Sequence, residues 1–282
     1  MINNIYISSI AFGGKDCEYI INTAKENNWS IEFSSSLPYH ADMEKIFLSA
    51  PIIRMPHNYF PAQINPFVLN LASNNPEIRE RSIKHCINGL YLSKKANSPF
   101  FAAHSGFCID PIVTELGKKI NHNGIFNKQV NWQLFFDSLQ QVLIVANELE
   151  IDFLVENNVI TAFNMKKDCN PLLCCESQDI EFLFKIKHPR LGLLLDTAHL
   201  KVSCLTLGLD IRNEVKKMQP YIRAIHHSDN DGTIDDNQAL NKNYWFLPFL
   251  SLYEDLIHVI EVKNIEVNRI QEQINLLQYY AT

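Results

Sequence analysis

The sequence predicts an α/β protein folded as one (β/α)8 TIM barrel. Three observations support this prediction. Eight short β-type runs recur along the 282 residues, longer helical segments separate most of them, and polar residues stand where the runs end. Strands that alternate with helices pair in parallel through crossover connections, and eight such units in under 300 residues suit one barrel better than two open sheets. Because no Gly/Pro/Ser-rich linker divides the chain, we expect a single domain over residues 1–282.

The expected strands are short apolar runs, and the last five are more clearly defined than the first two. In order they are NIYISS (4–9), WSIEFSS (29–35), PIIRMPH (51–57), PFFAAHS (99–105), IDFLVENN (151–158), LGLLLDT (191–197), YIRAIHHS (221–228) and LIHVIEVK (256–263).

Helical patterns lie between these runs, over residues 76–96, 131–150, 177–187, 211–219 and 265–280. The second of them repeats apolar residues at the spacing of an amphipathic helix, which needs one buried face. That face consists of Leu134, Phe135, Leu139, Val142, Leu143 and Ala146.

Composition restricts the function classes. Hydrophobic residues make up 46% of the chain, enough for a large core, and the net charge is −6. No block of like charges occurs, which argues against a nucleic-acid surface. The seven cysteines form no CxxC motif or disulfide pattern, so we expect reduced thiols in the cytoplasm. Neither a secretory signal nor a run of eighteen apolar residues is present, so no membrane association is expected.

Metal-competent side chains fall at or near the end of seven of the runs. They are Glu32, His57, His104, Glu156, Asp196, His226 and Glu261. In a parallel barrel the carboxyl ends of the strands converge on the face that carries the active site. We therefore expect these side chains to meet at one mouth.

Strand alternation selects between the adjacent histidines of the seventh run. Ile222, Ala224 and His226 share one face, and His227 lies on the other with Arg223. A small and apolar face suits the crowded barrel interior, so His226 is the expected ligand. By the same alternation Leu154, Leu194 and Val259 point inward with Glu156, Asp196 and Glu261.

The inward set suggests a metal-assisted proton transfer. Two Glu, one Asp and one His form a mixed O/N site suited to one divalent ion, either Mn, Mg, Co or Zn. Such an ion polarises a carbonyl or hydroxyl oxygen and stabilises an enediolate. Glu156 and Glu261 arrive from separate strands and could act as general base and acid on opposite sides of a carbon.

Several segments resemble the strand ends of the xylose isomerase-like TIM barrels. LVENN, LLLDTAH, IHHSDNDG and VIEVK match in order and spacing, and MPHNYF, NLAS and AAHSG extend the resemblance upstream. That group includes sugar and sugar-phosphate isomerases and epimerases, inosose dehydratases and endonuclease IV enzymes. The resemblance implies a metal held by Glu156, Asp196, His226 and Glu261, with Glu156 and Glu261 as the catalytic acid/base pair.

The resemblance also bears on metal number. Endonuclease IV enzymes hold three zinc ions, and their extra ligands correspond to His57, His104, His199, Asp235 and position 237. Asn237 stands where the nuclease has a histidine, and an amide is a poor zinc ligand, which counts against a third zinc. A second zinc site from His57 and His104 with Glu156 stays open.

Four residues are expected to contact substrate. His199 completes a DTxH pattern and is expected to bind substrate or a further metal, and Asp235 is placed with it. Glu32 is either a substrate contact or a buried, paired carboxylate. Lys263 shares the face of Glu261 and either binds a phosphate or pairs with a carboxylate.

The sequence thus predicts a metal-dependent sugar or sugar-phosphate isomerase or epimerase that acts on a small carbohydrate. A zinc phosphodiesterase or abasic-site nuclease, an inosose dehydratase-like lyase and a non-catalytic barrel are the alternatives. The substrate, the reacting carbon and the choice between a monomer and a homodimer are left open.

Overall fold

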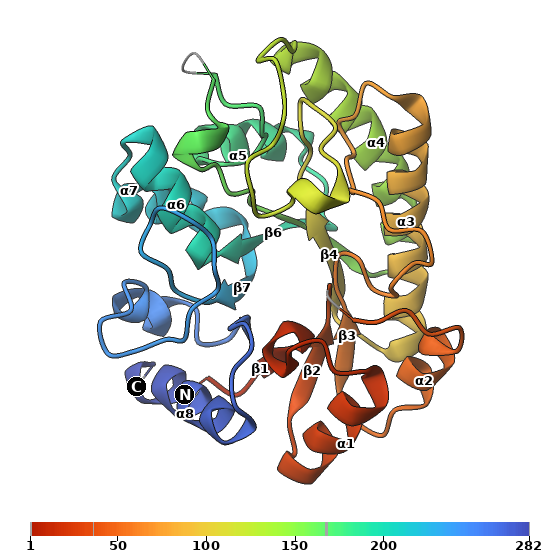
Figure 1. Cartoon of the computed structure of the whole chain (residues 1–282), viewed down its shortest axis with the longest axis vertical. Coiled ribbons are helices and arrows are strands. Elements are labelled where there is room, and N and C mark those ends of the chain that lie inside the picture. The colour runs from red at the N-terminus through yellow and green to blue at the C-terminus, as the bar shows by residue number, and fades with distance from the viewer. Residues whose placement is uncertain (1, 36, 167–168, 282) are drawn as a thin grey trace.

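Eight parallel strands form the centre of the molecule (Figure 1). The residues of each strand fall within one of the eight runs that the sequence predicts. The computed structural model describes residues 2–35, 37–166 and 169–281. The strands are β1 (Ile5–Ser8), β2 (Ser30–Phe33), β3 (Arg54–Pro56), β4 (Phe100–His104), β5 (Asp152–Glu156), β6 (Leu191–Asp196), β7 (Ile222–His227) and β8 (Ile257–Ile260).

The strand order closes the sheet into a barrel. Neighbouring strands run β3-β2-β1-β8-β7-β6-β5-β4, and every ladder is parallel. Between β3 and β4 the ladder is reduced to one bridge, His57 to Ala102, where the Asn58 N–H donates to the Ala102 carbonyl at 2.8 Å. Strand β3 is short and ends at Pro56, which has no N–H to donate. The predicted (β/α)8 TIM barrel is confirmed, and its least extensive strand pairing lies between β3 and β4.

Helices surround the strands in Figure 1. They are α1 (Cys17–Asn27), α2 (Met43–Ser49), α3 (Pro76–Ala96), α4 (Lys128–Leu149), α5 (Ser177–Leu183), α6 (Thr197–Leu207), α7 (Ile211–Met218) and α8 (Val267–Tyr280). Short 3-10 turns add η1 (Ser9–Phe12), η2 (Val113–Glu115), η3 (Ala162–Asn164), η4 (Phe184–Ile186), η5 (Gln219–Tyr221) and η6 (Leu247–Leu252). No described helix is both long and apolar enough to cross a membrane.

Local signals explain the boundaries of the long helix α3. The Asn75 side chain accepts from the Glu77 N–H at the amino end, and Pro76 occupies the first turn, where its missing N–H costs nothing. Asn97 ends the helix in the left-handed conformation, with φ of 55°. The predicted range 76–96 therefore agrees with the observed helix.

An apolar layer fills the barrel beneath the polar strand ends. It consists of Tyr6, Met55, Phe100, Ala102, Leu154, Leu194, Ala224 and Val259. The four members on β5 to β8 are the residues that strand alternation places inside, two positions before each candidate ligand. The candidate ligands therefore lie directly above a packed apolar layer. The larger hydrophobic core lies between the strands and the surrounding helices.

Candidate metal centre

The seven metal-competent residues meet at the carboxyl end of the barrel, as expected. The strand register places them at the same height along the barrel axis. His104 pairs with Glu156 between β4 and β5, and Asp196 pairs with His226 between β6 and β7. Glu32 lies on β2, and His57 and Glu261 follow the last residues of β3 and β8.

Glu156, Asp196, His226 and Glu261 form one compact group. Each offers a ligand atom, and these atoms lie within 4.8 Å of one another. The Nδ1 atom of His226 lies 2.8 Å from Glu261 Oε2, 3.7 Å from Glu156 Oε1 and 3.8 Å from Asp196 Oδ2. The four residues are buried. One ring nitrogen therefore faces three carboxylates from three different strands.

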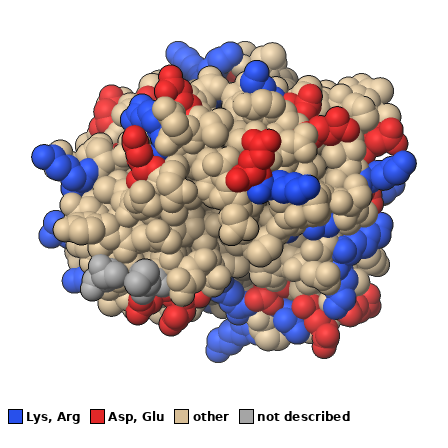
Figure 2. Space-filling model, turned by 90° about the horizontal axis from the view of Figure 1, so that it is seen from below, with Lys and Arg blue, Asp and Glu red and all other residues tan. Residues whose placement is uncertain are grey.

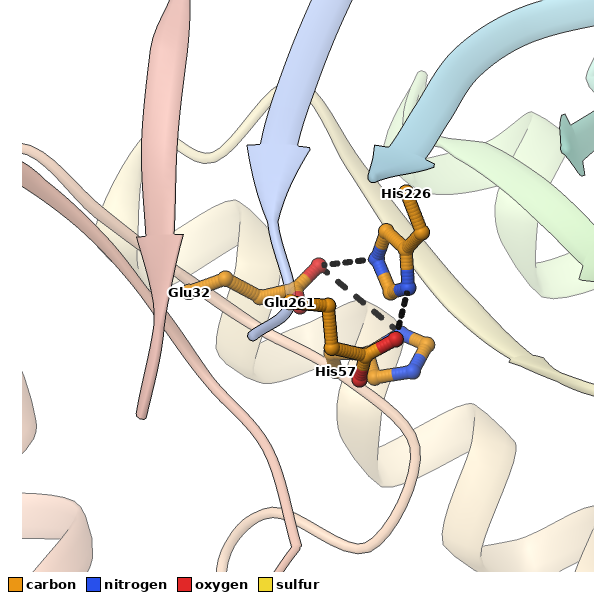
Figure 3. A group of neighbouring side chains, drawn as sticks. All are labelled: Glu32, His57, His226 and Glu261. Carbon is orange, nitrogen blue, oxygen red and sulfur yellow. Dashed lines mark hydrogen bonds and ion pairs between the residues drawn. The ribbon is translucent and has the colours of Figure 1, made fainter. Parts of the chain in front are cut away.

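Glu32 lies on the opposite side of the His226 ring. Its Oε2 is 3.1 Å from His226 Nε2 and 3.9 Å from His57 Nδ1, and both Glu32 and His226 are fully buried (Figure 3). Carboxylates commonly orient a metal-binding histidine through the ring nitrogen that does not bind the metal. The contact leaves Nδ1 of His226 directed at the other three carboxylates.

His57 and His104 form a second group with Glu156. The Nε2 atom of each histidine lies 3.2 Å from Oε2 of Glu156, and the three residues qualify together as a candidate metal site. The His57 side chain is 1% exposed, whereas His104 is 28% exposed. Glu156 thus belongs to both groups, with one oxygen directed to each.

His199 lies beside the first group and is held by its neighbours. Its Nδ1–H donates to the Asn157 carbonyl at 2.8 Å, and its Nε2 lies 3.2 Å from Asp235 Oδ2. Its backbone N–H donates to Asp196 Oδ1 at 2.7 Å, which makes Asp196 the cap of α6. The structure therefore brings His199, Asp235 and Asp196 together.

Concentrated negative charge governs protonation here. Burial favours the neutral His226 ring, yet Glu32 and Glu261 raise its pKa well above the usual value. Burial likewise opposes charge on His199, but Asp196 and Asp235 raise the pKa of His199 well above normal. For Asp196, burial and the nearby Glu261 raise the carboxyl pKa well above its normal value. A place that attracts protons so strongly also attracts a cation.

The residues fit a divalent cation. Among the described residues, no lysine or arginine forms an ion pair with Glu32, Glu156, Asp196 or Glu261. In the same part of the chain the buried Asp196 Oδ2 has no hydrogen-bond partner. Three carboxylates and one imidazole form an O/N donor set of the kind that Mn, Mg, Co and Zn accept.

A cavity of about 610 Å³ opens above this centre. Its lining includes residues from both groups and from the predicted substrate contacts, namely His57, His104, Glu156, His199, Asp235, Glu261 and Lys263. Glu32, Asp196 and His226 are outside the described lining and lie beneath it. Glu32 is fully buried and, together with His57, His226 and Glu261, forms a further group that could hold a metal ion.

Asn237 also lines the cavity, near Lys263. Its side-chain amide donates to Ser228 Oγ at 3.3 Å, and its carbonyl accepts the Lys263 N–H at 2.9 Å. Its φ is 51°, a conformation that asparagine tolerates better than most residues. The residue therefore has local structural partners of its own.

A buried network behind the centre was not anticipated from the sequence. His258 Nε2–H donates to the Tyr253 carbonyl at 2.9 Å, so its Nδ1 accepts from His227 Nε2–H at 2.8 Å. His227 Nδ1 then accepts from the Tyr244 hydroxyl at 3.0 Å, and Tyr244 contacts Thr197 Oγ1 at 2.6 Å. The outward direction of His227 was its only signal in the sequence. The network supports the backbone that carries His226 and Asp196.

Solved structures with this fold include several sugar epimerases. A D-tagatose 3-epimerase-like protein aligns over 99% of this chain and 100% of its own, with a TM-score of 0.71 and 17% identity. The TTHB071 protein from Thermus thermophilus, soaked with ZnCl2, aligns over 99% and 98%, with a TM-score of 0.70 and 17% identity. D-psicose 3-epimerase from Clostridium cellulolyticum, solved with D-tagatose, aligns over 99% and 95%, with a TM-score of 0.64 and 15% identity.

At these identities the structural likeness establishes the fold alone. No curated protein matched the chain in a sequence comparison. A family model described as xylose isomerase-like TIM barrel, however, matches residues 48–258, which is well over half of the chain. The chain belongs to the xylose isomerase-like TIM barrel family.

Proposed function

We propose that this protein is a metal-dependent isomerase or epimerase that acts on a sugar, a sugar phosphate or a related polyol. Glu156, Asp196, His226 and Glu261 would hold one divalent ion, and Glu156 and Glu261 would exchange the proton. We further propose that residues 1–282 form one functional domain. The sugar epimerases among the structural neighbours support a small carbohydrate as the ligand.

The position of the two glutamates is the observation that carries the proposal. Glu156 is the last residue of β5 and Glu261 follows β8; they belong to one ligand group, and both line the cavity. Burial opposes their ionisation, yet His104 and His57 lower the pKa of Glu156 well below normal, and His226 lowers that of Glu261. Both are therefore ionised at neutral pH, as a general base must be.

The reaction follows from this arrangement. A bound divalent ion would polarise the substrate carbonyl and neutralise charge that develops on oxygen. One glutamate removes the proton from the carbon beside the carbonyl, and the substrate becomes an enediolate. For epimerisation, the other glutamate takes up a proton from solvent and gives it to the opposite face of the same carbon, while the first glutamate releases its proton to solvent. For isomerisation, the first glutamate returns its proton to the neighbouring carbon, and the hydroxyl proton moves to the former carbonyl oxygen, so that a new carbonyl forms. His199 and Asp235 lie where they could bind substrate hydroxyls.

Deuterium exchange tests the proposal. Wild-type protein reconstituted with Mn²⁺ is incubated in D2O with ketohexoses, and proton NMR follows exchange beside the carbonyl. We expect exchange in the wild type and a loss of about 10²-fold or more, on the order expected for removal of a general base, in Glu156→Gln and Glu261→Gln. If both variants fold, bind metal and exchange at the wild-type rate, the acid/base assignment is wrong.

The second candidate is a zinc phosphodiesterase. The group of His57, His104 and Glu156 favours it, because it provides ligands for a second ion beside the first. Asn237 weighs against a three-zinc enzyme. On the face shown in Figure 2, the described basic and acidic side chains are interspersed rather than gathered into a continuous basic surface. Three zinc ions per chain by mass spectrometry, with cleavage of abasic DNA, would favour the nuclease over the epimerase.

A further inference from the structure

Exposed hydrophobic side chains surround the mouth of the cavity. Five large apolar residues both line the cavity and are at least 41% exposed, and each lies on a different strand-to-helix loop. They are Tyr39 after β2, Ile64 after β3, Val113 after β4, Phe163 after β5 and Ile234 after β7. Exposed apolar residues scattered singly need no explanation, but a ring around a concave site marks a binding surface.

The apolar surface continues downward into the cavity walls. Phe107 and Leu172 line the cavity, are 5% and 3% exposed, and belong to an apolar cluster separate from the main core. A backbone bridge joins them, and on either side of it Leu173 N–H donates to the Gly106 carbonyl at 3.1 Å and Cys108 N–H to the Pro171 carbonyl at 2.7 Å. The loops after β4 and β5 are thereby fixed together as a preformed apolar wall.

The cavity lining also contains polar side chains, including the acidic residues and histidines of the candidate site. Its acidic residues are Glu156, Glu261 and Asp235, its histidines are His57, His104 and His199, and the described lining contains two lysines, Lys118 and Lys263, and no arginine. Phosphate recognition typically relies on arginine forks, lysines and backbone amides acting together. The lining as a whole suits an uncharged group above a polar reacting end.

We propose that the substrate is amphipathic. Its hydroxyketone end reaches the metal centre, and an apolar substituent of about the size of a six-membered ring lies between the loop residues at the mouth. This inference rests on the proposed function and narrows its substrate class from free or phosphorylated sugars to polyols that carry a hydrophobic group. A cavity of about 610 Å³ is of the size that typically encloses a ligand larger than a single hexose.

The shape of the cavity favours a small amphipathic ligand over a second copy of the chain. The exposed ring, the buried wall of Phe107 and Leu172, and the candidate catalytic glutamates all line the same cavity. A flat protein surface that covered only the ring would leave Phe107 and Leu172 facing an empty apolar space, whereas a small amphipathic ligand would contact both levels at once.

A matched pair of probes tests the inference. Cyclohexyl hydroxymethyl ketone and hydroxyacetone share the reacting group and differ only in a ring against a methyl group. Both are titrated into Mn²⁺-loaded full-length protein by calorimetry, and α-deuterium exchange of each is followed in D2O. We expect the cyclohexyl compound to bind at least about tenfold more tightly, which is the effect of burying several methylene groups.

Paired variants locate the effect. Ile64→Ser/Phe163→Ser removes two exposed side chains of the cavity lining, neither of which belongs to a candidate metal group. Ile144→Ser/Leu252→Ser is the control, because these two residues are 59% and 61% exposed and are outside the described lining. We expect the first pair to weaken binding of the cyclohexyl ketone about tenfold and to leave hydroxyacetone within about twofold. The control should alter neither.

The outcomes separate the two proposals. Equal affinity for the two ketones, with exchange still catalysed, would overturn the apolar substituent and leave the isomerase proposal standing. Absence of exchange in metal-loaded protein for these ketones and for ketohexoses would contradict the proposed function itself. If Ile64→Ser/Phe163→Ser converts a dimer to a monomer in sedimentation and leaves ketone affinity unchanged, the exposed ring is a subunit interface and the inference is wrong.

Discussion

The Oε2 atom of Glu32 lies 3.1 Å from Nε2 of His226, and neither residue is exposed to solvent. The two are separated by 194 residues in the chain and meet because β2 and β7 end at the same face of the barrel. Figure 3 shows dashed lines from one oxygen of this carboxylate to the rings of both His226 and His57. A carboxylate in this position holds the tautomer and the orientation of the imidazole.

We predict that Glu32→Gln weakens metal binding about 10- to 100-fold, the usual effect of losing such a partner. Competition with a fluorescent chelator measures it, and the exposed Glu44→Gln serves as a control. A substrate contact would behave differently. If Glu32→Gln raises KM and leaves metal affinity unchanged, Glu32 binds substrate.

Asp196 is predicted to destabilise the metal-free protein. Its pKa is raised by burial and by neighbouring carboxylates, so keeping it ionised at neutral pH opposes folding. Asn retains the cap to His199 but carries no charge. In EDTA at pH 8 we expect Asp196→Asn to be more stable than wild type by on the order of 1 kcal/mol in urea unfolding.

The same substitution should remove the stabilisation that metal provides. Wild-type protein at about 100 times the metal Kd gains about 2.7 kcal/mol, and the variant should gain much less. A variant that is less stable than wild type in EDTA, yet equally stabilised by Mn²⁺, would refute this electrostatic account.

The buried His258 should make the fold sensitive to acid. Burial lowers the pKa of His258 to about 4, whereas an unfolded histidine titrates near about 6.5. Below pH 6.5 the unfolded chain binds a proton that the folded chain refuses, so stability is lost as pH falls from about 6.5 to about 4. The loss from this one group reaches about 3 kcal/mol at most.

His258→Gln tests that assignment. The variant should be less stable at pH 7.5, because it disturbs the hydrogen bonds to His227 and Tyr253, but its stability should fall less between pH 6.5 and 4.5. Urea unfolding at four pH values measures both effects, with the exposed His40→Gln as a control. Parallel pH profiles for wild type and His258→Gln would show that another group is responsible.

Strand positions and the inward set were predictable because both depend on local patterns. Alternation along β7 separates His226 from His227 without knowledge of any other strand, and barrel topology then brings the strand ends together. Helix α6 was missed, since Asp196 is at once the last residue of β6 and the cap of α6. Seven residues of that helix are buried, so it lacks the one-sided apolar pattern that reveals a helix.

Partner choice among buried polar groups could not be predicted from the sequence. Whether Glu32 faces substrate or His226 depends on side-chain directions across the barrel, and the stack of His227 on His258 joins residues from two strands. The apolar ring at the mouth is equally hidden, because Tyr39, Ile64 and Phe163 lie on loops that show no regular pattern. Tertiary structure alone determines which loop residues share a cavity.

The most direct test of the metal centre is the metal content of the purified protein. Wild type and His226→Asn are dialysed against Mn²⁺ and then against metal-free buffer, and the ions per chain are counted by inductively coupled plasma mass spectrometry. We predict at least one tightly bound divalent ion per chain in the wild type and its loss in His226→Asn with the fold intact by circular dichroism. A wild-type protein without bound ion under Mn²⁺, Co²⁺, Mg²⁺ and Zn²⁺, or equal occupancy in the variant, would contradict the account.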